Sequence, residues 1–250
     1  MANENKELIA ALDAMETTEK WEKYVRAKNE VFRGQIDIEK AEKFADYLTQ
    51  RFLDACNDKT VFGSFINWKN KTTDEKISIT DKIVKAFLQN IKFDILNDRV
   101  ELHTRDGRKY VKTNDTVDKL FREDIASCVP NMKVQNRDVP GALMGTTRTG
   151  DLYINTTNLL YQATPIFFLM DLKHELTHVV DMYIQNISIL DPTVNEEAQM
   201  FYVNPQRDRD LYKENPLELN ANQKRKDLRI KIQQMLDLQE STQTTQSHDR

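Results

Sequence analysis

The most constraining feature of this 250-residue chain is an apolar segment at residues 166–185, with the sequence IFFLMDLKHELTHVVDMYIQ. Its apolar residues recur at intervals of three and four, the spacing of an α-helix. Pro165 stands just before it, at a position where a missing N–H costs nothing. Apolar side chains flank the polar centre on both sides, which is typical of a helix in the middle of a fold. We therefore expect the rest of the chain to pack around this segment.

The composition predicts an α+β fold dominated by helix. Only 6 Gly and 6 Pro occur in the chain, too few for the many turns of an all-β architecture. Helical spacing of apolar residues appears three times before residue 95, and Thr80 is the expected N-cap of the third helix. These helices form an N-terminal layer over residues 1–95 and are expected at 6–35, 36–56 and 80–91.

The sequence pattern changes after residue 95, from helical spacing to short apolar runs separated by turn residues. Asp106-Gly107 between two short apolar runs predicts a β-hairpin, and residues 152–155 predict a further strand. A short helix is expected at 117–128, and a charged helix at 215–239. We expect one domain over residues 1–240, with its functional core at 96–240. The polar residues 241–250 are expected to form a disordered tail.

Charge and targeting signals exclude several classes of protein. The 36 Lys and Arg are outnumbered by 40 Asp and Glu, giving a net charge of −4. Such a chain does not attract phosphate backbones or anionic lipid, so we expect neither nucleic acid nor a membrane as partner. The first 24 residues lack the basic and apolar parts of a signal peptide, which predicts a protein cytoplasmic where it is made. Cys56 and Cys128 lie far apart and are expected to be buried thiols in a reducing compartment.

The central helix carries His174-Glu175-Leu176-Thr177-His178. Residues four apart lie on one face of a helix, so both imidazoles can bind a single ion. Zinc accepts neutral histidine nitrogen, and a catalytic zinc site uses three protein ligands and leaves a fourth position to water. Glu175 is turned by about 100° from His174 and is placed to act as a base beside the metal. The motif predicts a site in which zinc lowers the pKa of water and Glu175 takes its proton during peptide hydrolysis.

At His174, Glu175 and His178 the chain resembles the zincin metallopeptidases. The resemblance implies a zinc endopeptidase whose substrate is a protein, with a small mixed sheet packed on the motif helix. It also implies that a strand just before this helix binds the substrate as an added strand. We expect Leu152 to Asn155 to be that edge strand.

Several glutamates are candidates for the third metal ligand. His103 lies far upstream in the hairpin and His248 in the tail, so a downstream carboxylate, as in gluzincin-like members, is the expected choice. Glu218 lies in a stretch resembling the second helix of small bacterial and phage zincins, and is preferred. Glu197, nineteen residues after His178, resembles the spacing of aminopeptidases and thermolysin-like enzymes and is the alternative. Glu196 and Glu214 are further candidates. Asn215-Pro216 before Glu218 also predicts the capped start of a helix. Glu218 can belong to such a helix start and also be a metal ligand only if its side chain turns inward.

Other polar residues are expected to support the site. Metal-bound imidazoles usually donate their second N–H to a carboxylate, and Asp181 is preferred for this role over Asp171. Tyr202 and Tyr212 are candidates to donate a hydrogen bond to an oxyanion.

The biological setting has three open alternatives. The chain resembles injected metalloprotease effectors of bacterial pathogens, which cut a host protein after delivery by a dedicated secretion system. It could instead be a cytosolic repressor-cleaving peptidase. A third possibility is a non-catalytic binding module in which the metal is structural and has four protein ligands. We expect a monomer in each case.

Overall fold

The computed structural model describes residues 18–34, 38–91, 100–103, 109–112, 133–137, 143–146, 151–183, 201–203 and 207–248. The helices are α2 (Thr18–Arg33), α3 (Ile38–Cys56), the 3₁₀ turn η1 (Trp68–Asn70), α4 (Thr73–Asn90), α6 (Leu159–Ala163), α7 (Pro165–Tyr183), α9 (Arg209–Glu214), α10 (Pro216–Ala221) and α11 (Arg225–His248). The strands are β1 (Val100–His103), β2 (Lys109–Lys112), β3 (Val134–Asn136), β4 (Met144–Thr146) and β5 (Leu152–Ile154). The fold is thus α+β and helix-dominated, as expected.

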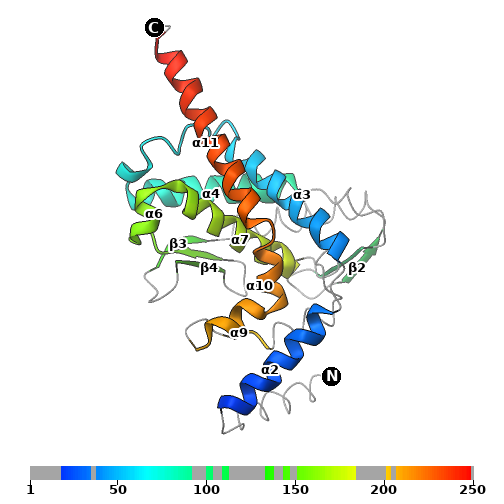
Figure 1. The fold of residues 1–250 in the computed structure, drawn as a ribbon. Helices are drawn as coiled ribbons and strands as arrows, with labels where there is room; N and C mark the ends of the chain where they lie inside the picture. The colour runs from blue at the N-terminus through cyan, green and yellow to red at the C-terminus, as the bar shows by residue number, and fades with distance from the viewer. Residues whose placement is uncertain are drawn as a thin grey trace.

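Helix α7 lies at the centre of the molecule (Figure 1). It begins at Pro165, and its side chains are buried over most of its length and on all sides, including Phe168, Leu172, Leu176 and Val180. Helices α3, α6, α10 and α11 and strand β4 pack against it. The expectation of a central helix is confirmed, because a helix that is apolar around its circumference has to be covered on every side.

The third helix of the N-terminal layer begins earlier than expected. Thr72, and not Thr80, is the N-cap of α4, and it forms a capping box with Glu75. Thr80 lies inside the helix, where its buried hydroxyl donates to the carbonyl oxygen of Lys76 at 2.8 Å. A threonine can satisfy its hydroxyl in this way within a helix, so the residue alone does not identify a helix start.

The two sheets are small. Strands β1 and β2 form the antiparallel hairpin expected around residues 100–111. The second sheet has the order β3-β5-β4, with β5 parallel to β3 and antiparallel to β4. The expectation that Leu152 to Asn155 form an edge strand is therefore wrong, because β5 has a neighbour on both sides. Among the described strands, β4 lies at an edge of this sheet, and it packs on α7.

Two hydrophobic clusters hold the helices together. The larger one surrounds α7 and includes residues of α3, α4, β5 and α11. The smaller one joins α2 to the segment at 201–203 and to α9 and α10, and consists of Val25, Phe32, Ala41, Phe201, Val203, Leu211 and Leu217. Helix α2 thus packs at the α9–α10 end of the molecule (Figure 1).

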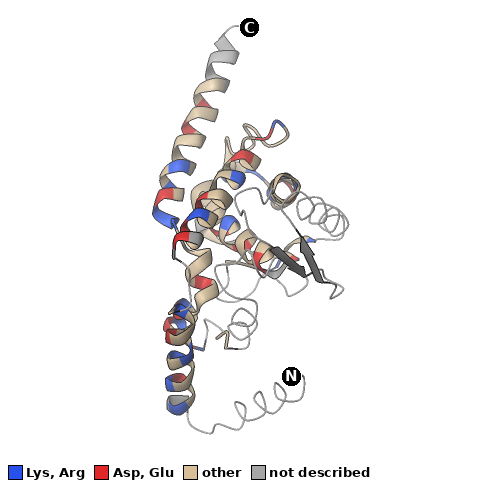
Figure 2. Cartoon of the chain, turned by 90° about the vertical axis from the view of Figure 1, so that its right-hand side faces the viewer, with Lys and Arg blue, Asp and Glu red and all other residues tan. Residues whose placement is uncertain are grey.

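The single charged helix expected at 215–239 is divided into α10 and α11, and α11 ends later than expected. Residues 241–248, expected in a disordered tail, belong to α11. The hydroxyls of Ser241 and Thr242 donate to the carbonyl oxygen of Leu238, which satisfies them inside the helix. Extending an existing helix needs no new nucleation, so weak helix formers can continue it. Lys or Arg and Asp or Glu both occur along α2 and α11 (Figure 2).

Some expectations fall outside the described residues, among them the helix at 117–128 and Cys128. Cys56 is a free, buried thiol, and burial raises its pKa above the ordinary value. None of the described helices has the length and apolarity needed to cross a bilayer.

The packing of α7 makes a stability prediction. Phe168 is fully buried, and the centroid of its ring lies 4.9 Å from the ring centroid of Trp68 and 5.4 Å from that of Tyr161. Phe168→Ala should lower the free energy of unfolding by about 3–5 kcal/mol, because it leaves a cavity between two rings. The neighbouring Phe167 is 36% exposed, and Phe167→Ala should cost less than about 1 kcal/mol. Urea unfolding of both variants measures the difference, and equal losses would contradict this description of the core.

Candidate metal centre

Three side chains from two helices converge beside the middle of α7. His174 and His178 come from α7, and Glu218 comes from α10. The two Nε2 atoms are 3.1 Å apart, and each lies 3.2 Å from an oxygen of Glu218. The imidazole rings are nearly perpendicular, with centroids 4.7 Å apart. The sequence-predicted histidine pair and the preferred glutamate are thus brought together.

The chemistry and spacing of these atoms suit a metal ion. Tetrahedral zinc with ligands at 2.0–2.1 Å places its ligand atoms about 3.3 Å from one another, close to the spacing seen here. The Oε2 atom of Glu218 is buried and makes no hydrogen bond within the described part of the chain, although His174 Nε2 is 3.2 Å away. One oxygen of the buried carboxylate is thus without a hydrogen-bond donor among the described residues. A buried group of two imidazoles and a carboxylate can hold a metal ion here.

Glu218 reaches the histidines because of the way α10 begins. Asn215 is the N-cap, and its side-chain oxygen accepts from the backbone N–H of Leu217 at 3.0 Å. Pro216 takes the first helical position, and Glu218 turns inward with none of its surface exposed. The stretch is therefore both a capped helix start and a source of a metal ligand. Asn215 makes the cap, so the Glu218 carboxylate is free to contact the histidines of α7.

Electrostatics couples the carboxylate to the imidazoles. Burial raises the pKa of Glu218, but contacts with His174 and His178 outweigh it and hold this pKa well below its usual range. Burial lowers the pKa of His178, but the hydrogen bond and charge of Glu218 outweigh it and raise the pKa to about 9. The buried carboxylate is therefore ionised and requires a positive partner, which a metal ion supplies as well as a proton does.

Tyr202 supports Glu218 with a hydrogen bond. Its hydroxyl donates to Oε1 of Glu218 at 2.6 Å, and its ring packs edge-on against Tyr212. Burial, followed by the charge of Glu218, raises the pKa of Tyr202, so this hydroxyl keeps its proton and remains a donor. Both tyrosines were candidates to donate to an oxyanion; in the structure the Tyr202 hydroxyl donates to the Glu218 carboxylate.

Asp181 lies one helical turn beyond His178 and is almost fully buried. Its Oδ2 atom accepts from Nδ2 of Asn220 on α10 at 2.9 Å, while its Oδ1 atom has no partner within the described ranges. Burial raises the pKa of Asp181 to about 6, although His178, Asn220 and Lys173 act in the opposite direction. Asp181 therefore ties α7 to α10 next to the metal group, a role that the sequence did not indicate.

Glu175 is positioned by the sheet. Its side chain is mostly buried, and its Oε2 atom accepts a hydrogen bond from Oγ1 of Thr146 at 2.8 Å. Thr146 is the last residue of β4 and was not singled out by sequence. The carboxylate predicted to act as a base is thus held by the edge strand and lies next to the first histidine of the group.

The remaining candidate residues have other partners or lie outside the structure. Glu214 is partly buried and forms an ion pair with Arg26 at 2.5 Å, and it does not belong to the group of His174, His178 and Glu218. Asp171 binds Arg225 at 2.6 Å and accepts from the Tyr161 hydroxyl at 2.7 Å. Glu196 and Glu197 are not among the described residues, so the alternative third ligand remains a prediction.

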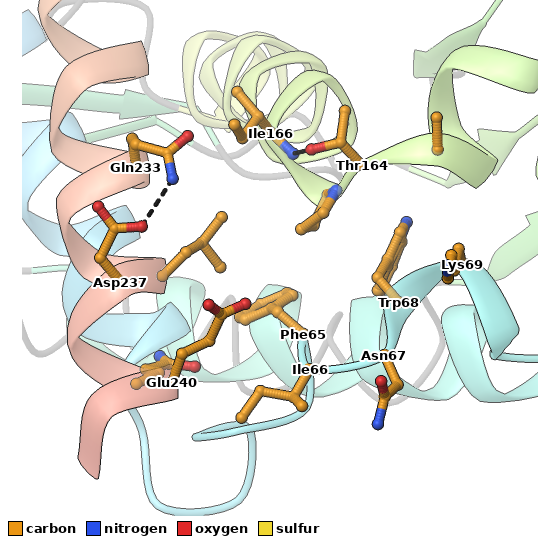
Figure 3. Close-up of a pocket in the computed structure, with 14 residues that line it drawn as sticks. Phe65, Ile66, Asn67, Trp68, Lys69, Thr164, Ile166, Gln233, Asp237 and Glu240 are labelled. Carbon is orange, nitrogen blue, oxygen red and sulfur yellow. Dashed lines mark hydrogen bonds between the residues drawn. The ribbon is translucent and has the colours of Figure 1, made fainter. Parts of the chain in front are cut away.

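A hollow of about 330 Å³ lies elsewhere, between the turn at 65–69, the start of α7 and α11 (Figure 3). Phe65, Trp68 and Ile166 line it, and Gln233 on its α11 side donates to Asp237 at 2.8 Å. None of the residues of the metal centre lines this hollow.

Comparison with protein-family models, curated proteins and solved structures gave no match. The functional interpretation therefore depends on the geometry of this site. Sequence reasoning found the two histidines and both key glutamates, but missed Tyr202 as the donor to Glu218 and Thr146 as the donor to Glu175. A single tyrosine or threonine carries no spacing signal, and both contacts join segments far apart in the chain.

Removal of the third ligand tests the centre. Glu218→Ala should bind zinc more than about 100-fold more weakly than the unaltered protein, because a direct ligand contributes more than its supporting hydrogen bonds do. Isothermal titration with zinc and metal analysis of the purified protein measure this loss. Glu197→Ala is the matched control and should keep stoichiometric metal; the reverse result would assign the third ligand to Glu197.

The hydrogen bond from Tyr202 makes a smaller prediction. Tyr202→Phe keeps the ring but removes the donor to Glu218, and should weaken zinc binding by about tenfold. The same titration measures it, with unfolding in the presence of chelator as a check on folding. Unchanged zinc affinity would show that this contact does not orient the carboxylate.

Proposed function

We propose that this protein is a zinc-dependent endopeptidase of the zincin type that hydrolyses a protein substrate. The observation that carries the proposal is the buried triangle of His174, His178 and Glu218 with Glu175 directly beside it on α7. Within the described residues the group has three ligands. That number is typical of catalytic zinc, whereas structural zinc has four protein ligands.

The chain's own residues divide the work. His174, His178 and Glu218 would hold the zinc ion, and Tyr202 orients the Glu218 carboxylate. When bound, zinc acts as a Lewis acid that polarises a peptide carbonyl and lowers the pKa of water. Glu175 accepts the proton of the attacking water and transfers it to the leaving amine. The Thr146 hydroxyl already donates a hydrogen bond to Oε2 of Glu175, so Oε1 is the oxygen that carries this proton.

The sheet offers a place for the substrate. Strand β4 has β5 on one side and, among the described strands, no partner on the other. An extended peptide can add to such an edge through backbone hydrogen bonds. Since the Thr146 side chain of β4 contacts Glu175, a peptide at this edge passes next to the base. We therefore propose that the substrate strand adds to β4, in place of the expected residues 152–155.

Glu175→Gln tests the reaction separately from metal binding. The variant should retain zinc, because Glu175 is not a ligand, but lose at least about 10²-fold in hydrolysis, because the amide cannot accept a proton. New protein termini in a cell extract, read by mass spectrometry after incubation with each protein, measure the loss. Glu39→Gln on α3, whose side chain is 80% exposed, should behave as the unaltered protein. Equal cleavage by Glu175→Gln would contradict the proposal, and so would zinc-loaded protein that produces no new termini.

A further inference from the structure

The face of the three-stranded sheet that points away from the core has its own chemistry. Along β5, Leu152 and Ile154 are buried, whereas Tyr153 between them is only partly buried. Side chains alternate between the faces of a strand, so Tyr153 lies on the face opposite to the core. Its cross-strand partner on β4 is Gly145.

Gly145 allows the Tyr153 ring to lie across the edge strand. A Cβ atom at Gly145 would be 2.1 Å from the Tyr153 hydroxyl oxygen and 2.2 Å from Cζ, so no other residue fits beneath the ring. Neighbouring strands are about 4.8 Å apart, and the ring therefore spans from β5 to β4. The hydroxyl is thus placed at β4, the strand on which the proposed substrate would add.

Two hydrogen-bond donors meet on this face. The exposed Arg137, which follows β3, has its guanidinium carbon 5.8 Å from the centre of the Tyr153 ring. Within the described part of the chain, Arg137 has no ion pair and the Tyr153 hydroxyl has no hydrogen bond. Burial, and next the charge of Glu175, raise the pKa of Tyr153, so the hydroxyl keeps its proton and remains a donor. A cation and a hydroxyl donor together suit an anionic acceptor.

We propose that Arg137 and Tyr153 form a binding subsite for an acidic side chain, Asp or Glu, of the peptide substrate. The inference deepens the proposed function and rests on it, because it assumes that the peptide adds to β4.

The register of the strand identifies which substrate residue carries the acid. Thr146 points toward α7 and contacts Glu175, so the substrate residue opposite Thr146 faces the metal centre. Its neighbour, opposite Gly145, faces the other side of the sheet, next to Tyr153. Gly145 has no side chain and leaves this position free. The acidic residue therefore stands at one fixed distance in sequence from the bond that is cut.

The test compares cleavage sites made by the unaltered protein and by Arg137→Glu in a denatured cell extract. Alignment of the new termini should show Asp and Glu enriched about tenfold at one position for the unaltered protein, and Lys and Arg enriched there for the variant. Arg229→Glu is the matched control. Arg229 also lies over an aromatic ring, that of Phe167, at 5.9 Å, but on α11, and its loss should leave the preference unchanged.

Tyr153→Phe separates the two donors. It should keep the acidic preference but reduce it severalfold, because the guanidinium remains and the hydroxyl is lost. An unaltered profile without acidic enrichment at a fixed position, or an Arg137→Glu profile identical to it, would overturn the subsite while leaving the peptidase intact.

A binding measurement covers the case in which no cleavage is seen. Zinc-loaded Glu175→Gln protein is titrated with three decapeptides of Thr, Val and Ala that differ only in one central Asp, Lys or Ala. The Asp peptide should bind about tenfold more tightly than the Ala peptide, and Arg137→Glu in the same background should reverse the order of Asp and Lys. Equal binding of the three peptides would overturn the subsite. Selective binding without any cleavage would instead overturn only the proposed reaction.

Discussion

The structure depends on one buried charge, the carboxylate of Glu218. It has no exposed surface, and its ionised form would be costly in the interior without compensation. Two imidazoles of α7 and the hydroxyl of Tyr202 supply that compensation from different segments. The need to satisfy this carboxylate fixes α10 against α7. It also gathers, at one point, the ligand atoms that a metal ion requires.

The N-terminal helix α2 contributes to the same site from a distance. Phe201 and Val203, on either side of Tyr202, are buried in the small cluster with α2. The ring centroids of Phe201 and Tyr24 are 5.6 Å apart. Arg26 of α2 pairs with Glu214 at the end of α9. These contacts orient the segment that presents Tyr202 to Glu218. The helical N-terminal part is thus connected to the metal centre through packing, although it supplies no ligand among its described residues.

The fold was predictable where the signal is local. Helical spacing identified α3 and α7 closely, and Asp106-Gly107 identified the β1–β2 hairpin, because these patterns depend on neighbouring residues. The incorrect predictions concern features that depend on contacts with residues distant in the sequence. Thr80 proved to be inside a helix capped by Thr72, and β5 proved to be the central strand. Strand order and the choice between two threonines follow from contacts that no short stretch of sequence contains.

The candidate site divides in the same way. By itself, the sequence determined that His174 and His178 share one helix face with Glu175 beside them, because the geometry of a single helical turn places them there. It left several glutamates open as the third ligand. Only the tertiary structure brought Glu218, forty residues further on, to the two imidazoles, and only the tertiary structure placed Thr146 on Glu175. Spacing along a helix is set by covalent geometry, whereas the meeting of distant segments is set by which faces of the helices and strands are buried together.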